Sequence, residues 1–184
     1  MAHPEEEGRV PRGRAIITYP QYIDECAIYL GKLRDLYTAK IKQKDPIHQR
    51  DKDKNTENVN ITGARGELVF FHHLFIHGIE HETPLLLSSG PISSYDVKVE
   101  GIAVDVKTIR HDGSDLLVRE DQHQRAKAKI YAFLKVVPGQ KAYIWTFRYD
   151  DVSKWAIQPY KHNNCYCLPI EYIVPSSDNP KQGE

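Results

Sequence analysis

Two short segments in which apolar and polar residues alternate constrain the fold more than any other feature of this sequence. They read YDVKV and IAVDVKTIR, and Glu100-Gly101 separates them. Alternation with a period of two predicts half-buried strands, and glycine supplies the positive φ that a two-residue hairpin loop needs. We therefore predict an antiparallel hairpin that turns at Glu100-Gly101.

The register of this hairpin sorts its side chains onto two faces, because successive side chains of a strand point to opposite sides of the sheet. The predicted core face is apolar and consists of Val97, Val99, Ile102, Val104 and Val106. The opposite face is mostly charged and consists of Asp96, Lys98, Ala103, Asp105 and Lys107.

In this register Asp96 and Asp105 lie directly opposite each other, where two carboxylates repel. A divalent cation would compensate the repulsion, because one or two carboxylates, together with waters and phosphate oxygens, typically hold Mg²⁺. Lys107 shares their face and is placed to neutralise developing negative charge or to orient a water molecule. The alternative is an exposed face on which both aspartates are solvated, and a turn longer by one residue would remove their direct opposition.

The rest of the chain predicts further helices and strands. Apolar residues at three- and four-residue spacings indicate helices over 21–44 and 64–77, and 121–129 is a candidate for a short polar helix. IYAFLKVV and AYIWTFRY indicate two more strands around a Pro-Gly-Gln turn. This order predicts an α+β or mixed α/β domain. Its expected parts are a flexible arm over 1–14, one domain over 15–175 and a flexible tail over 176–184.

Glu67 lies near the start of the second predicted helix, for which Thr62 is the candidate N-cap and Gly78 the C-terminal stop. The dipole of a helix favours a glutamate in its first turn, which is a purely local explanation. The neighbouring Gly63 and Gly66 cost helix stability unless another backbone or a ligand approaches closely.

Composition excludes several classes of protein. Of the 184 residues, 40% are hydrophobic and 27% are charged, which argues against a wholly disordered chain and against a coiled coil. No apolar run approaches the length of a membrane helix, and three cysteines are too few for a disulfide framework. We therefore expect a soluble, cytoplasmic protein with no membrane partner.

Two other patterns carry less weight. His73, His77 and His81 are spaced by four, but Gly78 is expected to end the helix before His81, so we do not predict a histidine metal site. The alternating aromatic residues of AYIWTFRY share one face of a strand, which core packing explains.

Glu67, Asp96 and Asp105-Val106-Lys107 together read E-x28-D-x8-D-x-K. In this pattern the sequence resembles the PD-(D/E)XK nuclease superfamily. The stretch 63–148 also follows the family's order of helix, hairpin, strand, helix and strand. Two departures are Ser94-Tyr95 in place of the family's proline and the lack of a Gln-x-x-x-Tyr motif on the following helix. The resemblance implies a restriction-endonuclease-like fold, a central mixed β-sheet flanked by helices.

The resemblance also implies roles for individual residues. Asp96 and Asp105 would bind Mg²⁺, or Mn²⁺ in its place, together with the backbone carbonyl of Val106. Lys107 would assist the attacking water, and Glu67 would be an auxiliary acid that helps to hold metal or water. The candidates for phosphate contacts, which a solvated surface explains equally well, are Arg110, Arg119, Gln124, Arg125, Lys127 and Lys129.

The expected function is therefore divalent-metal-dependent hydrolysis of phosphodiester bonds in DNA by a restriction-like endonuclease. A homodimer is expected, because two symmetric sites suit the cutting of both strands. One alternative is a Holliday-junction resolvase or a structure-specific repair nuclease. The other is a catalytically silent nucleic-acid-binding module of the same fold. A partner subunit that supplies specificity is left open.

Overall fold

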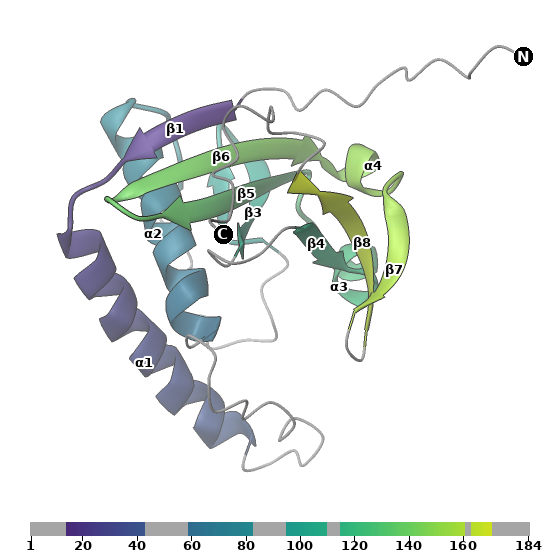
Figure 1. Cartoon of the computed structure of the whole chain (residues 1–184), viewed down its shortest axis with the longest axis horizontal. Coiled ribbons are helices and arrows are strands. Elements are labelled where there is room, and N and C mark those ends of the chain that lie inside the picture. The colour runs from purple at the N-terminus through teal and green to yellow at the C-terminus, as the bar shows by residue number, and fades with distance from the viewer. Residues whose placement is uncertain (1–13, 43–58, 83–94, 110–114, 161–162, 171–184) are drawn as a thin grey trace, which may run out of the picture.

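The computed structural model describes residues 14–42, 59–82, 95–109, 115–160 and 163–170. Within them the chain has a mixed α/β fold of two sheets and four helices (Figure 1). The helices are α1 (Tyr22–Lys42), α2 (Val59–Ile76), α3 (Glu120–Arg125) and α4 (Tyr149–Val152). The strands are β1 (Arg14–Thr18), β2 (Val97–Val99), β3 (Ile102–Ile109), β4 (Asp115–Arg119), β5 (Ile130–Val137), β6 (Lys141–Arg148), β7 (Ala156–Tyr160) and β8 (Asn163–Pro169).

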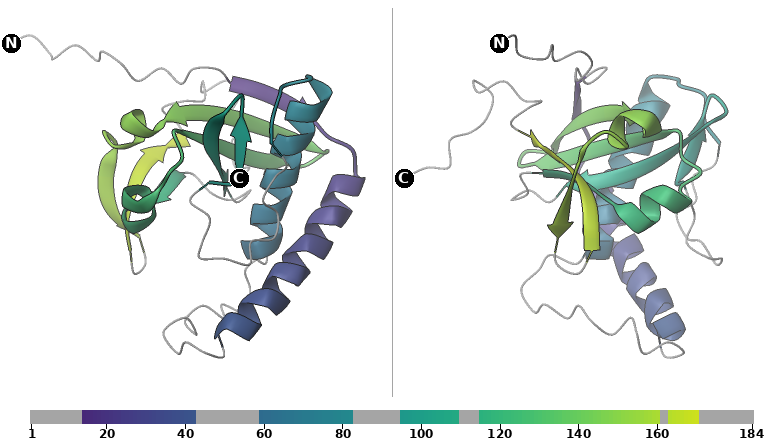
Figure 2. Two further views of the ribbon diagram at one scale, coloured as in Figure 1. Left: turned by 180° about the vertical axis from the view of Figure 1, so that it is seen from behind. Right: turned by 90° about the vertical axis from the view of Figure 1, so that its right-hand side faces the viewer.

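The larger sheet has five strands in the order β1-β6-β5-β3-β2. Only its central pair, β3 and β5, is parallel, and the other neighbours are antiparallel, so the sheet is mixed. The smaller sheet has three antiparallel strands in the order β4-β8-β7. Figure 2 shows it as a separate curved layer on the side of the larger sheet away from α1 and α2.

The predicted hairpin is confirmed, including its register. Glu100 and Gly101 form its turn with φ of 48° and 77°, and Val97 pairs with Val104. The core face is confirmed for Val97, Val104 and Val106, which are buried. Ile102 was predicted to belong to the core but is 45% exposed, because it directly follows the turn at the tip of the hairpin.

One core lies between α2 and the larger sheet. The apolar side chains of α2, including Val69 and Phe70, pack there against Val104 and Val106 of β3. We expected another backbone or a ligand to approach these glycines closely. At Gly66 the close neighbour is instead a side chain, because a Cβ atom there would overlap that of Thr108. A Cβ atom at Gly63 would meet only Arg34 Nη1, at 4.0 Å, so Gly63 does not serve the same purpose.

A second core lies on the opposite face of the larger sheet. Phe133 and Trp145 pack there against Leu116 and Leu168 of the smaller sheet, together with Trp155. Strand β5 alternates between the two cores, which explains why the run IYAFLKVV is apolar almost throughout. The aromatic residues of β6 lie in this second core, as predicted.

Most helices and strands were predicted from the sequence, but some begin at other residues than predicted and some were not predicted. Helix α2 begins at Val59, so Thr62 lies inside its first turn and is not the N-cap that we predicted. Strands β1 and β4 were not predicted, since each has five residues and pairs with a strand far away in sequence. Most of the predicted arm and the whole predicted tail lie outside the described residues. No helix in the described part of the chain is long and apolar enough to cross a membrane.

Candidate active site

Asp96 lies just before β2, at the edge of β3, and its side chain bonds to the backbone of that strand. Its carboxylate Oδ2 accepts a hydrogen bond of 2.6 Å from the Val106 N–H, and its own N–H donates to the Val104 carbonyl at 2.9 Å. The Asp96 side chain is therefore fixed beside β3. This bond anchors Asp96 between the β3 residues Asp105 and Lys107.

The pKa of Asp96 is raised to about 8, first by burial and then by the negative charges of Asp105 and Glu67. The hydrogen bond from Val106 and the charge of Lys107 act in the opposite direction but are weaker. Asp105 is thus close enough for its charge to disfavour the ionisation of Asp96, in keeping with the proximity predicted from the hairpin register.

Lys107 contacts Asp105 directly. Its Nζ lies 2.8 Å from Asp105 Oδ2, and both side chains keep partial access to solvent, 27% and 15% respectively. The alternation of β3 puts both residues on one face of the strand, because they are two positions apart. The ammonium group therefore pairs with Asp105 while the Lys107 side chain stays partly open to solvent.

Glu67 has a partner that the sequence did not reveal. Arg34 of α1 donates from Nη1 to Oε1 at 2.8 Å and from Nη2 to Oε2 at 2.6 Å. Burial alone would lower the pKa of Arg34, but its hydrogen bond to Glu67 and the charges of Glu67 and Asp96 outweigh this and raise it. Both Glu67 oxygens are thus engaged, and the charge of Glu67 is balanced.

The donor set at this edge fits a cation held by two carboxylates. Asp96 and Asp105 supply hard oxygen donors beside each other, which suit Mg²⁺ or Mn²⁺ bound with additional waters and phosphate oxygens. Among the described residues, no group of three or more histidine, cysteine or acidic side chains is arranged to hold a metal ion. Glu67, in its pair with Arg34, therefore does not complete a three-acid site, and His73 and His77 belong to no such group among the described residues.

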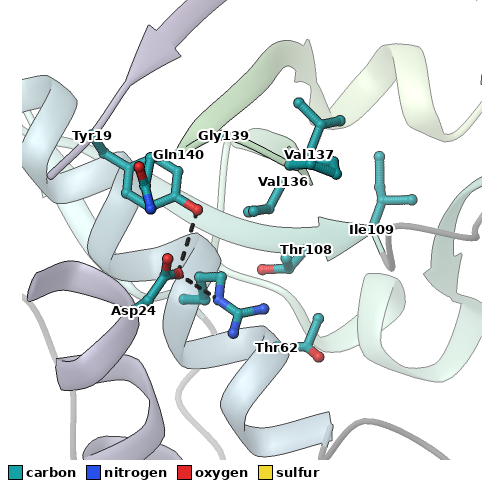
Figure 3. Close-up of a pocket in the computed structure, with 11 residues that line it drawn as sticks. Tyr19, Asp24, Thr62, Thr108, Ile109, Val136, Val137, Gly139 and Gln140 are labelled. Atoms are coloured by element: carbon teal, nitrogen blue, oxygen red, sulfur yellow. Dashed lines mark hydrogen bonds and ion pairs between the residues drawn. The ribbon is translucent and has the colours of Figure 1, made fainter. Parts of the chain in front are cut away.

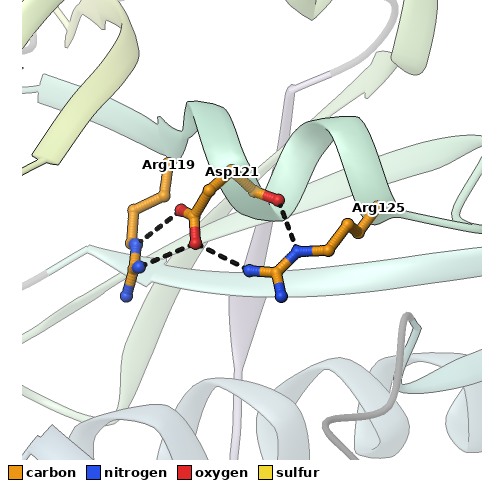
Figure 4. Close-up of polar contacts among 3 residues, drawn as sticks. All are labelled: Arg119, Asp121 and Arg125. Carbon is orange, nitrogen blue, oxygen red and sulfur yellow. Dashed lines mark hydrogen bonds and ion pairs between the residues drawn. The ribbon is translucent and has the colours of Figure 1, made fainter. Parts of the chain in front are cut away.

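Two of the predicted phosphate-binding arginines flank one aspartate (Figure 4). Arg119 donates to both Asp121 oxygens at 2.9 Å, and Arg125 donates to Oδ2 at 2.7 Å and to the Asp121 carbonyl at 2.8 Å. Partial burial would raise the pKa of Asp121, but its bonds and charge contacts with the two arginines lower it overall. The cluster therefore carries one net positive charge.

The other predicted phosphate-binding residues differ in their placement. Gln124 is exposed on α3 and bonds to Glu120 at 3.5 Å, while Lys127 and Lys129 are exposed between α3 and β5. The backbone of Lys129 bonds to the Ala103 carbonyl at 2.9 Å, which places it at the start of β3. Arg110 lies outside the described residues.

Helix α3 itself contributes a buried histidine, His123, that was not predicted. His123 is 2% exposed, stacks on Tyr149 and lies 2.9 Å from the Tyr131 hydroxyl through Nδ1 and 2.8 Å from Ser153 Oγ through Nε2. Burial lowers the pKa of His123. Burial and then the charge of Asp105 raise the pKa of Tyr131, which pairs in register with Asp105. No local sequence signal marks this histidine, because its neighbours on α3 are polar.

A cavity of about 350 Å³ lies where the first turns of α1 and α2 meet the C-terminal ends of β3 and β5 (Figure 3). Arg65 and Asp24 form an ion pair of 2.9 Å in it, and the Tyr19 hydroxyl donates to Asp24 at 3.4 Å. None of the four predicted catalytic residues lines this cavity.

Comparison with known proteins adds no relative from which a function could be transferred. No protein-family model matches the chain, and no curated protein matches it.

Proposed function

We propose that this chain is a divalent-metal-dependent nuclease that hydrolyses phosphodiester bonds in DNA, with Asp96, Asp105 and Lys107 as its active site. One observation carries the proposal: Asp96 is fixed at the edge of β3 beside Asp105, and the Lys107 ammonium contacts Asp105 on the same strand. The resemblance to the PD-(D/E)XK superfamily rests on the same residues.

The order of elements supports a restriction-endonuclease-like fold. Helix α2, the hairpin β2–β3, β4, α3 and β5 follow one another in the order of helix, hairpin, strand, helix and strand that the family shows. The larger sheet is mixed, and α2 covers one face of it. Strand β4 differs in that it pairs with β8 in the smaller sheet.

Each residue of the proposed site has its own role in the reaction. Mg²⁺ or Mn²⁺ held by Asp96 and Asp105 would supply Lewis-acid activation of a water molecule and would neutralise phosphoryl charge. The partly exposed Lys107 ammonium is available to orient the attacking water or to donate to a phosphate oxygen. Glu67, held by Arg34, positions α2 beside the site and is not assigned a metal.

Cleavage of supercoiled plasmid in the presence of Mg²⁺ or Mn²⁺ tests the proposal. We expect the natural protein to nick or linearise the plasmid and expect Asp105→Ala and Lys107→Ala to abolish this activity. Asp150→Asn, which removes an exposed carboxylate on α4, is the matched control and should cut normally. Cutting that survives both active-site substitutions would contradict the assignment of the site.

The substrate is proposed to be duplex DNA cut in the manner of a restriction endonuclease. A four-way junction and a linear duplex of the same arm sequence, offered side by side, distinguish this from a resolvase or a structure-specific repair nuclease. Selective cutting of the junction would favour the resolvase or repair nuclease over the restriction-like endonuclease. The proposed active-site residues would be unchanged.

A catalytically silent DNA-binding module is the second candidate. It is favoured by the engagement of both Glu67 oxygens by Arg34, which leaves two carboxylates at the site. Titration with Mn²⁺ by calorimetry separates the two candidates. The nuclease is expected to bind Mn²⁺, to lose this binding in Asp105→Ala and to keep it in Lys107→Ala. DNA binding without Mn²⁺ binding or cutting would favour the module.

A further inference from the structure

Helix α1 carries a row of apolar side chains beside the side that packs against the rest of the chain, and most of them are exposed. Its buried residues, Ile23, Ala27 and Leu30, belong to the side that packs against the rest of the chain. Figure 1 shows α1 at the outer edge of the helix layer, and its C-terminal part extends beyond the sheets. This row, which we call the α1 stripe, consists of Tyr22, Cys26, Tyr29, Leu33 and Leu36.

Most side chains of the α1 stripe are exposed to solvent and so are open to contact with a partner. Tyr22, Tyr29 and Leu36 are 56%, 68% and 64% exposed. Cys26 is exposed as well, and Leu33 is half-buried. Single exposed apolar residues are common, whereas several on one side of a helix are a feature of interaction sites.

The spacing of the stripe specifies the kind of partner. Its members follow one another at intervals of four, three, four and three residues, which is the repeat that keeps one seam of a helix facing a second helix. The fitting partner is therefore another helix with the same repeat. The α1 stripe of a second copy of this chain provides one.

Two charged residues beside the stripe determine the orientation of this pair. Glu25 and Lys32 are both exposed and flank the stripe on the same side, one heptad apart. In an antiparallel pair about a two-fold axis, Glu25 lies opposite Lys32 of the other copy, and the contact occurs twice. The same register brings Cys26 opposite Tyr29. In a parallel pair, Glu25 would instead lie beside Glu25 of the other copy, and Lys32 beside Lys32.

We propose that the α1 stripe is the contact surface of a homodimer in which two α1 helices pack antiparallel about a two-fold axis. The proposal does not depend on nuclease activity, because it rests on the exposure, spacing and charges of α1 alone. One helix face is a small interface, so the dimer should dissociate in the micromolar range of concentration.

Sedimentation velocity of the full chain over increasing concentration tests the dimer. We expect a monomer–dimer equilibrium that Tyr29→Glu shifts to monomer, because a carboxylate would then enter the centre of the seam. The matched control is Ile157→Glu, which places the same charge on an exposed apolar position of β7 and should leave the equilibrium unchanged. A natural protein that stays monomeric at all concentrations, or a dimer that persists in Tyr29→Glu, would overturn the proposal.

Charge exchange tests the orientation. Glu25→Lys and Lys32→Glu should each weaken dimerisation about tenfold or more, because each places like charges opposite one another twice. The double variant restores opposite charges and should recover the natural affinity. If the double variant is as weak as the single ones, the antiparallel arrangement is wrong. Thermal unfolding of each variant confirms that the exposed substitutions leave the fold intact.

Cross-linking at Cys26 gives an independent measurement. Cys165 and Cys167 are buried, so a short bismaleimide should react at Cys26. Because both copies of Cys26 lie close to the proposed axis, we expect a covalent dimer that is absent in Cys26→Ser and in Tyr29→Glu. Equal cross-linking of the natural protein and Tyr29→Glu would count against the interface.

Discussion

The Arg34 guanidinium holds both oxygens of the Glu67 carboxylate, at 2.8 Å and 2.6 Å, and so joins α1 to α2. Both side chains are largely buried, with 18% and 11% of their surface exposed. Glu67 is also close enough to Asp96 for its charge to raise the pKa of Asp96. The ion pair therefore links the packing of the two helices to the electrostatics of the candidate active site.

Arg34→Met should lower the free energy of unfolding by about 3 to 5 kcal/mol, because it leaves a buried carboxylate without its partner. Adding Glu67→Gln to Arg34→Met removes the uncompensated charge and should recover part of that loss. Urea denaturation of the two single variants and the double variant measures the coupling. Strictly additive effects would show that the two side chains are not coupled.

The matched control for this ion pair is Lys98, which pairs with Glu82 at 3.2 Å on the exposed hairpin. Its side chain and that of Glu82 are 37% and 57% exposed, so solvent screens their attraction. Lys98→Met should therefore change the free energy of unfolding much less than Arg34→Met does.

Gly66→Ala should destabilise the protein by about 1 to 3 kcal/mol, although alanine is the better helix former. The added Cβ atom would overlap the side chain of Thr108 on β3, so α2 must move away from the sheet. Thr108→Ala removes most of the overlap and should reduce the cost of Gly66→Ala. Gly63→Ala is the control in the same helix: its Cβ atom meets only Arg34 Nη1 at 4.0 Å, so it should be neutral or stabilising. Chemical denaturation measures the free energy of unfolding of these variants. Equal effects of Gly66→Ala and Gly63→Ala would contradict the prediction.

The contrast between Glu67 and Asp96 shows what the sequence alone could predict. Alternation with a period of two and the glycine at position 101 determine the hairpin register, and with it the proximity of Asp96 and Asp105. The Arg34–Glu67 pair spans 33 positions, and only the packing of α1 on α2 selects that arginine from a basic segment. A local pattern is enough in the first case, whereas the second depends on tertiary contacts.

The same distinction explains the missed strands and the missed histidine. Strand β1 pairs with β6 and strand β4 pairs with β8, so neither has a hairpin turn beside it to indicate its partner. His123 lies in a polar segment, and it is buried because Tyr149 and Tyr166 cover its ring.

His123 makes the stability of the protein depend on pH. Ser153 Oγ donates to the Tyr149 carbonyl at 3.0 Å, so it accepts from His123 Nε2–H, and Nδ1 accepts from the Tyr131 hydroxyl. This arrangement requires a neutral ring. Burial lowers the pKa of His123 below its ordinary value of 6.5, so the unfolded chain binds the proton more readily than the folded one. The stability that the neutral His123 contributes is therefore complete above about pH 6.5 and is lost as the pH falls below this value.

His123→Gln should therefore flatten the pH profile of stability. As pH falls below about 6.5, the natural protein should lose up to about 1.4 kcal/mol per pH unit more than the variant does. Urea denaturation of both proteins at pH 7.5 and pH 5.5 measures this difference, and the contributions of other groups largely cancel. A difference that is the same at both values of pH would contradict a neutral, buried His123.

Asp121→Asn tests whether Arg119 and Arg125, two of the candidates for phosphate contacts, contact the phosphates of DNA. Asp121 balances one of the two positive charges, and the arginine side chains are 44% and 71% exposed. Removing the negative charge should strengthen DNA binding at low salt. It should also steepen the dependence of log K on log salt, by about 0.9 for each additional phosphate contact.

Arg119→Ala should weaken DNA binding. Asp150→Asn is the matched control, because it removes an exposed carboxylate on α4. Fluorescence anisotropy with a labelled duplex over a salt series measures these effects. If Asp121→Asn and Asp150→Asn behave alike, the surface of α3 does not contact DNA.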